Sequence, residues 1–130
     1  MNELRPLLTF DRITVGETYG DREIDVSAEM VAAYASAVGA QSAPAYLMAA
    51  SWTVPRVSFS QWTVPPGGIH ARQTWQGYQR ISAGATLRLR ITAKEKYHAK
   101  SRPYVVFESV IESADGVRLA SGEMTLLWPA

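Results

Sequence analysis

Residues 42–54, SAPAYLMAASWTV, are the stretch that decides the fold of this chain. No charged residue occurs between Glu29 and Arg56. The first residue of the stretch is a suitable N-cap, Pro44 is compatible with a first helical turn, and Pro55 ends the helix by disfavouring helical geometry before it. The stretch therefore predicts a short helix that is apolar or small on every side, and such a helix has to be covered by other elements.

Composition narrows the class of protein. The 130 residues suit one domain, residues 1–130, with a core of useful size. A net charge of +1 gives no reason to expect nucleic acid or an anionic membrane as partner. There is no cysteine, which excludes disulfides and thiolate metal sites. The N-terminus has no apolar core of signal-peptide length, and Gly39 and Pro44 interrupt the uncharged run. We expect a soluble, cytoplasmic protein.

The rest of the chain predicts one more helix and several antiparallel strands. Ser27 is the expected N-cap of a helix that stops at Gly39. From residue 57 onward the apolar period changes from helical to alternating, and Asp115–Gly116 is a strong tight-turn signal. Residues 1–9 are a loosely specified lead-in, and residues 56–66 are predicted as loop with room for a short helix or strand. The expected strands cover residues 18–25, 69–79, 87–94, 104–112 and 117–128, with a basic hairpin over 94–102.

Long antiparallel strands beside a helix with no exposed face favour an α+β fold in which a curved sheet wraps round that helix. This is the hot-dog architecture, and three runs of the sequence carry a family resemblance. Residues 10–39, FDRITVGETYGDREIDVSAEMVAAYASAVG, resemble the opening of MaoC-like dehydratase domains. Residues 67–91, GGIHARQTWQGYQRISAGATLRLRI, resemble the family's central strands, and residues 43–52, APAYLMAASW, resemble its central helix. The resemblance is strongest to the non-catalytic, N-terminal type of half-domain in the (R)-specific enoyl-CoA hydratase family.

The resemblance also shows what this chain lacks. Hydratases of the family carry an Asp and a His in a D-x-N-P-x-H segment before the central helix, because hydration of an enoyl thioester needs a base and an acid. Here GAQSAPAY leads from Gly39 directly into the central helix, with Gln41 and Tyr46 nearest to the two missing positions. Neither side chain is a base at neutral pH. The resemblance therefore implies a pairing role without hydratase activity of its own.

Candidate site residues each have a structural and a functional interpretation. His70, next to the Gly67–Gly68 turn, is a structural histidine or a general base, and Tyr46 is the other weak catalytic candidate. Glu108 is expected to be an exposed strand residue. Two distant histidines make a metal site improbable, and no cofactor is expected. The residues expected to line an acyl site, or otherwise to belong to the core or to an interface, are Ala45, Tyr46, Trp52, Trp62 and His70, with Trp75 as a further aromatic of this kind.

The basic hairpin is the clearest hint of binding. Coenzyme A and phosphopantetheine carry phosphates, which Lys96, Lys100 and Arg102, with Lys94 and His98 nearby, would attract. The alternative is a solvated tip whose charges prevent aggregation at the sheet edge.

Three functions remain open. The first is a non-catalytic subunit that binds acyl thioesters of coenzyme A or acyl carrier protein and pairs with a catalytic MaoC-like chain in fatty-acyl or polyketide metabolism. The second is a stand-alone homodimeric enzyme of specialised metabolism with other chemistry, using His70 or Tyr46. The third is a module that only binds a small ligand. Long strands with free edges predict a dimer, either homodimer or heterodimer, in every case.

Overall fold

The computed structural model describes residues 5–37, 39, 59, 61–78 and 84–129. Its elements alternate strands with one short α-helix and one 3-10 turn. In chain order they are η1 Phe10–Arg12, β1 Thr18–Asp25, α1 Ala28–Ala37, β2 Ile69–Gly77, β3 Thr86–Ala99, β4 Arg102–Ser113 and β5 Arg118–Leu127.

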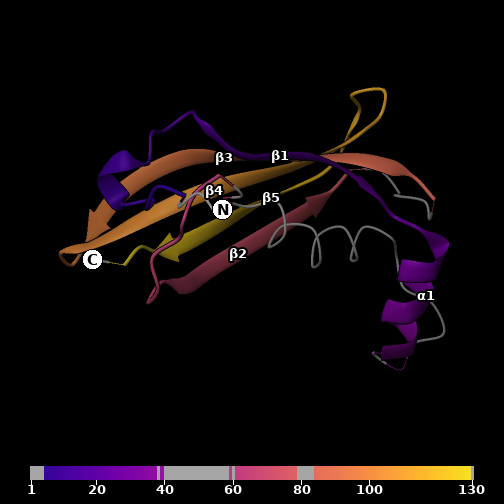
Figure 1. Cartoon of the computed structure of the whole chain (residues 1–130), viewed down its shortest axis with the longest axis horizontal. Coiled ribbons are helices and arrows are strands. Elements are labelled where there is room, and N and C mark those ends of the chain that lie inside the picture. The colour runs from indigo at the N-terminus through magenta and orange to yellow at the C-terminus, as the bar shows by residue number, and fades with distance from the viewer. Residues whose placement is uncertain (1–4, 38, 40–58, 60, 79–83, 130) are drawn as a thin grey trace.

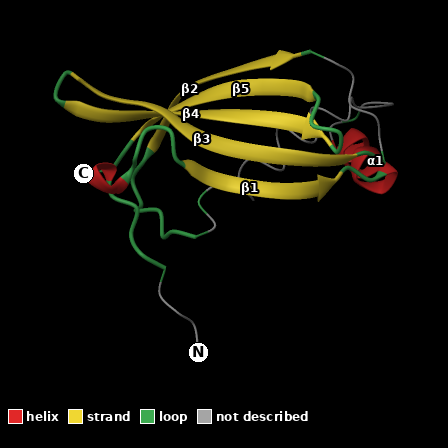
Figure 2. Cartoon of the chain, turned by 90° about the horizontal axis from the view of Figure 1, so that it is seen from above, coloured by secondary structure: helices red, strands yellow, loops and turns green. Residues whose placement is uncertain are grey.

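The five strands form one antiparallel sheet in the order β1-β3-β4-β5-β2. The sheet is twisted, and the β3–β4 hairpin projects from it at the end opposite α1 (Figures 1 and 2). The strand predicted over residues 18–25 has those bounds, and the other predicted strands are confirmed with ends that differ by a few residues. Strand β2 ends at Gly77, and residues 79–83 lie outside the described residues.

Local signals account for the ends of α1 and of the long hairpin. The Met30 N–H donates to Ser27 Oγ at 3.1 Å, which confirms the predicted N-cap. Gly39 follows the helix with φ of +74°, the left-handed conformation of a C-terminal stop. Lys100 and Ser101 turn the β3–β4 hairpin with φ of 50° and 65°, as a two-residue hairpin turn requires. The basic hairpin predicted over 94–102 is thus confirmed.

The core lies on one face of the sheet, here called the inner face. Alternation along β3 buries Leu87, Leu89, Ile91 and Ala93, as the sequence predicts. The inner-facing residues of β4 are buried in the same way: Val105, Phe107, Ser109 and Ile111.

The opposite, outer face of the sheet is less exposed than alternation predicts. Val106 and Val110 face outward on β4, yet each is only 8% exposed. Val110 lies directly across from Arg90, whose long side chain is half-buried and ion-paired with Glu112. The aliphatic stem of such a side chain covers neighbouring apolar surface.

The N-terminal lead-in is more ordered than the sequence predicts. Leu8 is fully buried, and its carbonyl oxygen accepts a hydrogen bond from the Trp128 indole at 2.9 Å. Leu7 forms an isolated parallel β-bridge with Thr63. Thr63, which belongs to the segment predicted as loop, is therefore attached to the lead-in. The reason is that Leu8 packs into the core cluster and that Trp128, directly after β5, donates its buried N–H to this segment.

The predicted central helix over residues 42–54 lies outside the described residues. The antiparallel sheet of the α+β fold is confirmed, whereas the wrapping of that sheet round the helix stays a prediction.

Candidate functional site

Three of the predicted site residues, Ala45, Tyr46 and Trp52, lie within residues 40–58, outside the described residues. Their roles stay predictions. The same holds for Gln41 and for the helix start at Pro44.

The described inner face carries an aromatic cluster. Phe59 and Phe107 pack edge to face with ring centroids 4.9 Å apart, and Trp128 lies 5.7 Å from Phe59. Tyr19 contacts Phe107 from β1 at 6.1 Å. Trp62 is half-buried, with its ring 6.2 Å from Tyr19. The predicted binding residue Trp62 thus lies at the margin of a buried aromatic core.

Tyr19 contributes structure rather than acid–base chemistry. Burial raises the pKa of its hydroxyl above the ordinary value. The hydroxyl oxygen accepts from the Thr14 N–H at 2.7 Å, and the hydroxyl lies 3.0 Å from Glu17 Oε2 as donor. The phenol therefore stays neutral at physiological pH and ties the start of β1 to the preceding turn.

His70 lies on β2, at the opposite edge of the sheet from β1. His70 pairs with Leu126 on β5, and Leu126 pairs on its other side with the inner-facing Val105 on β4. His70 therefore belongs to the inner face. Its side chain is exposed. Within the part of the chain that the structure describes, no ring contact joins His70 to Trp62.

Among the described residues, neither histidine has the carboxylate partner that acid–base catalysis usually requires. Across the described residues, no hydrogen bond or ion pair joins His70 or His98 to an Asp or Glu. Residues 40–58 contain no Asp, Glu or His at all. In the same described ranges, no three His, Asp or Glu side chains come close enough to hold a metal ion. The described residues therefore show no acid–base pair of the kind that hydration of an enoyl thioester requires.

The basic stretch at the end of β3 is divided between the two faces of the sheet. A β-bulge between Ala93 and Glu95 reverses the alternation. Lys96 consequently turns to the inner face, where its ammonium donates to the Phe10 carbonyl oxygen at 3.0 Å and lies 4.6 Å from the Phe10 ring centroid. His98 packs against the same ring at 5.1 Å.

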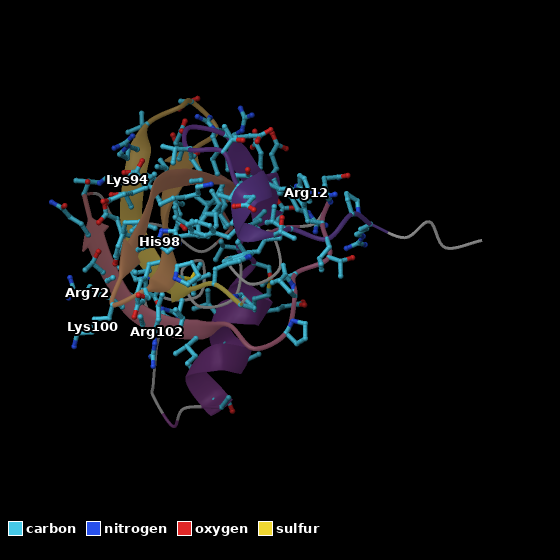
Figure 3. All side chains as sticks on the ribbon, turned by 90° about the vertical axis from the view of Figure 1, so that its left-hand side faces the viewer. Arg12, Arg72, Lys94, His98, Lys100 and Arg102 are labelled. Carbon is cyan, nitrogen blue, oxygen red and sulfur yellow. The ribbon has the colours of Figure 1, made fainter. Side chains whose placement is uncertain are left out.

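The other cations of this stretch lie on the outer face or at the tip. Lys94 is ion-paired with Glu123, and that carboxylate raises the pKa of the Lys94 ammonium. Lys100 and Arg102 are exposed at the hairpin tip (Figure 3). The structure therefore does not bring the three predicted phosphate contacts together, since Lys96 contacts Phe10 on the other face.

An outer-face groove of about 460 Å³ is a feature that the sequence did not predict. Tyr78 and Ser121 share a hydrogen bond of 2.9 Å at this groove. Glu108, predicted to be exposed, is half-buried and lines the groove with Glu123. Alternation along β4 and β5 places both carboxylates on this face, but only the pairing of β5 with β2 shows which polar residues join them. The further lining residues are Thr74, Trp75, Gln76, Arg118 and Gly122.

None of the helices in the described part of the chain is long and apolar enough to span a membrane.

Comparison with known proteins identifies the fold. No protein-family model and no curated protein sequence matches the chain. The structure is similar to the monoamine oxidase regulatory protein of Archaeoglobus fulgidus, with a TM-score of 0.79, 13% identity, and coverage of 98% of this chain and 99% of the other. It is also similar to a MaoC-like dehydratase from Rhodospirillum rubrum, with a TM-score of 0.72, 14% identity, and coverage of 95% and 98%.

A third similar structure is the HadBC (3R-hydroxyacyl-ACP dehydratase) complex of Mycobacterium tuberculosis, with a TM-score of 0.65, 14% identity, and coverage of 87% of this chain and 96% of the other. At these identities the likeness concerns the fold. The family resemblance of the sequence is thereby confirmed at the level of the fold, while residues 43–52 lie outside the described residues. This chain has the hot-dog fold of the MaoC-like dehydratases.

Proposed function

We propose that this chain is a non-catalytic hot-dog subunit that binds acyl thioesters and pairs with a catalytic MaoC-like hydratase or dehydratase chain in fatty-acyl or polyketide metabolism. The fold supports this proposal, because the HadBC dehydratase complex is built from subunits of the same fold. The resemblance of the sequence to the non-catalytic, N-terminal type of half-domain points in the same direction.

The contrast between the two edge strands carries the pairing part of the proposal. No described strand pairs with the free side of β1 or of β2. Strand β1, TYGDREID, has four charged residues in eight, a composition that discourages pairing with another chain. Strand β2, IHARQTWQG, has only Arg72 as a fully charged residue and is exposed along almost its whole length. An exposed, weakly charged edge of nine residues is suited to pair with a strand of a second subunit.

The absence of a visible acid–base pair supports a non-catalytic role. Hydration of an enoyl thioester needs a proton acceptor for water and a proton donor for the α-carbon. Among the described residues, no hydrogen bond or ion pair joins His70 to a carboxylate. A catalytic partner would supply the missing Asp and His, while this chain would contribute apolar surface to the acyl site.

The acyl-binding part of the proposal rests on the inner face. Trp62 is half-buried at the margin of the aromatic cluster, and His70 lies exposed on the same face. Ala45, Tyr46 and Trp52 complete the proposed site from the uncharged stretch. Lys100 and Arg102 remain the proposed contacts for the phosphates of the carrier, and Lys96 is an additional cation on the inner face.

Purification of an affinity-tagged chain from its native host, followed by native mass spectrometry, tests this proposal. We expect a complex with a second hot-dog chain that carries the D-x-N-P-x-H segment. The double variant Gln73→Lys with Thr74→Lys places two cations on β2, one on each face, and should abolish the complex because like charges and lysines oppose edge pairing. The control Glu23→Lys makes the same change in net charge on β1 and should leave the complex intact. A folded particle of 14.3 kDa, the mass of one chain, would refute pairing.

A stand-alone homodimer is the second candidate, because the β2 edge would serve equally well for two copies of this chain. The same mass spectra distinguish the two candidates. A particle that contains only this chain, twice, together with turnover that depends on His70 or Tyr46, would favour the homodimeric enzyme. A homodimer with a bound small molecule and no turnover would favour the ligand-binding module.

A further inference from the structure

An apolar row crosses four strands on the outer face near the hairpin tip. The strand register places Tyr97, Tyr104, Leu127 and Ile69 side by side on β3, β4, β5 and β2. The two tyrosine rings stack with centroids 5.3 Å apart and an interplanar angle of 14°. Ile69 is 57% exposed, and the other three are half-buried. This apolar row is continuous surface of a kind that marks interaction sites when polar residues border it.

Cations border the apolar row on both sides. Arg102 belongs to the next outer-facing pair toward the hairpin tip, in which it lies directly across from Ala99. Lys100 lies in the turn beyond this pair. Arg72 lies in the row on the other side, across from Thr125. Figure 3 shows Arg72 and Lys100 on the same side of this end of the molecule. None of the three forms an ion pair with another described residue.

The size of the apolar row fits a helix. Three strand spacings of about 4.8 Å make the row about 14 Å long, which is between two and three turns of an α-helix. A helix lying along the row would place apolar side chains on Tyr97, Tyr104 and Leu127. The residues on its two sides would face Arg102 and Lys100 on one flank and Arg72 on the other. Glu95 is exposed at the β3 end of the Arg72 flank, so acidic residues would be excluded there.

We propose that this outer-face row is the docking site for an acidic amphipathic helix of a partner protein. The proposal goes beyond the acyl-thioester function and does not depend on it. Charge complementarity identifies the partner, because among the described residues three exposed cations flank the apolar row and one carboxylate, Glu95, lies beside it. Three cations fall short of the cluster of roughly four to eight that anionic membranes recruit. The row is also an extended surface rather than a pocket, which disfavours coenzyme A alone as its ligand.

NMR titration of the isotope-labelled full chain tests the proposal. The probe is an 18-residue helical peptide with leucines on one face and glutamates on both sides of that face. We expect shifts confined to the backbone amides of residues 69–72, 97–104 and 125–127, and an affinity that weakens as salt is raised, because exposed charges are screened. A peptide with lysines in place of the glutamates should bind at least tenfold more weakly.

Two charge-reversal variants with the same net charge make the test specific. Arg72→Glu, Lys100→Glu and Arg102→Glu together should weaken binding of the acidic peptide at least tenfold. The matched control reverses three exposed arginines elsewhere, Arg5, Arg22 and Arg118, and should weaken binding less than threefold. Retained binding in the first variant, equal loss in both, or no shifts with millimolar peptide would refute the proposal. Binding of phosphatidylserine vesicles or of free coenzyme A at these amides, without binding of the peptide, would also refute it and identify a lipid or nucleotide ligand instead.

Discussion

The substitution Trp128→Phe tests how the N-terminal lead-in is held to the sheet. Trp128 is 2% exposed, and its indole N–H donates to the carbonyl oxygen of the fully buried Leu8 at 2.9 Å. Phenylalanine keeps most of the ring contacts with Phe59 and Phe107 but has no donor. The substitution therefore leaves a buried carbonyl without its partner.

The expected cost is the sum of two terms. A buried acceptor that loses its partner costs about 1–3 kcal/mol, and the smaller ring leaves unfilled space that costs about 1 kcal/mol more. The free energy of unfolding should fall by about 2–4 kcal/mol. With a urea dependence of about 1.5 kcal/mol per molar, the midpoint should fall by about 1–3 M.

Urea unfolding followed by circular dichroism at one fixed protein concentration is the assay, since assembly also contributes to the apparent stability. Trp62→Phe is the matched control, because the Trp62 ring is half-buried and its indole donates no hydrogen bond to another described residue. It should cost less than about 1 kcal/mol, because it loses packing area alone. Equal effects of the two substitutions would show that the indole–carbonyl hydrogen bond does not hold the lead-in.

Three further predictions concern charge and activity. Arg88 donates two hydrogen bonds to Asp21 and holds the pKa of that carboxyl below its ordinary value, so the pair stabilises the fold above pH 4 or so and loses this effect as the pH falls through the lowered pKa. Asp21→Asn should therefore lower the melting temperature slightly at pH 6 and by less as the pH falls through the lowered pKa; a loss that does not shrink with falling pH would contradict the linkage. The isolated chain should not hydrate crotonyl-CoA or longer enoyl-CoA substrates, and turnover that disappears on changing Tyr46 or His70 would overturn this expectation. Changing Lys100 and Arg102 to Ala should weaken binding of coenzyme A thioesters and flatten its salt dependence, whereas unchanged affinity would leave the two cations without a role in phosphate binding.

Alternation was enough to predict the strands and the inner-facing core. Leu87, Leu89 and Ile91 alternate with charged or polar residues. Because side chains along a strand point to opposite faces in turn, this pattern fits a strand with one buried and one exposed face. The Ser27 cap was predictable because hydrogen bonding between a cap and its helix is local in sequence. The position of β2 at the free edge was not predictable, because its pairing with β5 joins segments about fifty residues apart through backbone groups that every residue carries.

The N-terminal lead-in illustrates a second limit of the sequence. Leu8 packs in the same core cluster as Trp128, whose indole donates to the Leu8 carbonyl oxygen. The two residues are 120 positions apart in the sequence. Nothing within a few residues of Leu8 indicates this partner, since the lead-in has neither helical nor alternating periodicity.

The β-bulge in β3 explains why the predicted phosphate cluster and the observed charge distribution differ. In an unbroken strand, Lys94, Lys96 and His98 would share one face with one another, and the hairpin would present a single basic surface. The extra residue between Ala93 and Glu95 shifts the alternation by one position. Lys96 and His98 therefore contact Phe10 on the inner face. The same shift moves Tyr97 to the outer face, where it stacks on Tyr104. One extra residue thus removes two basic side chains from the outer face and contributes an aromatic ring to the apolar row.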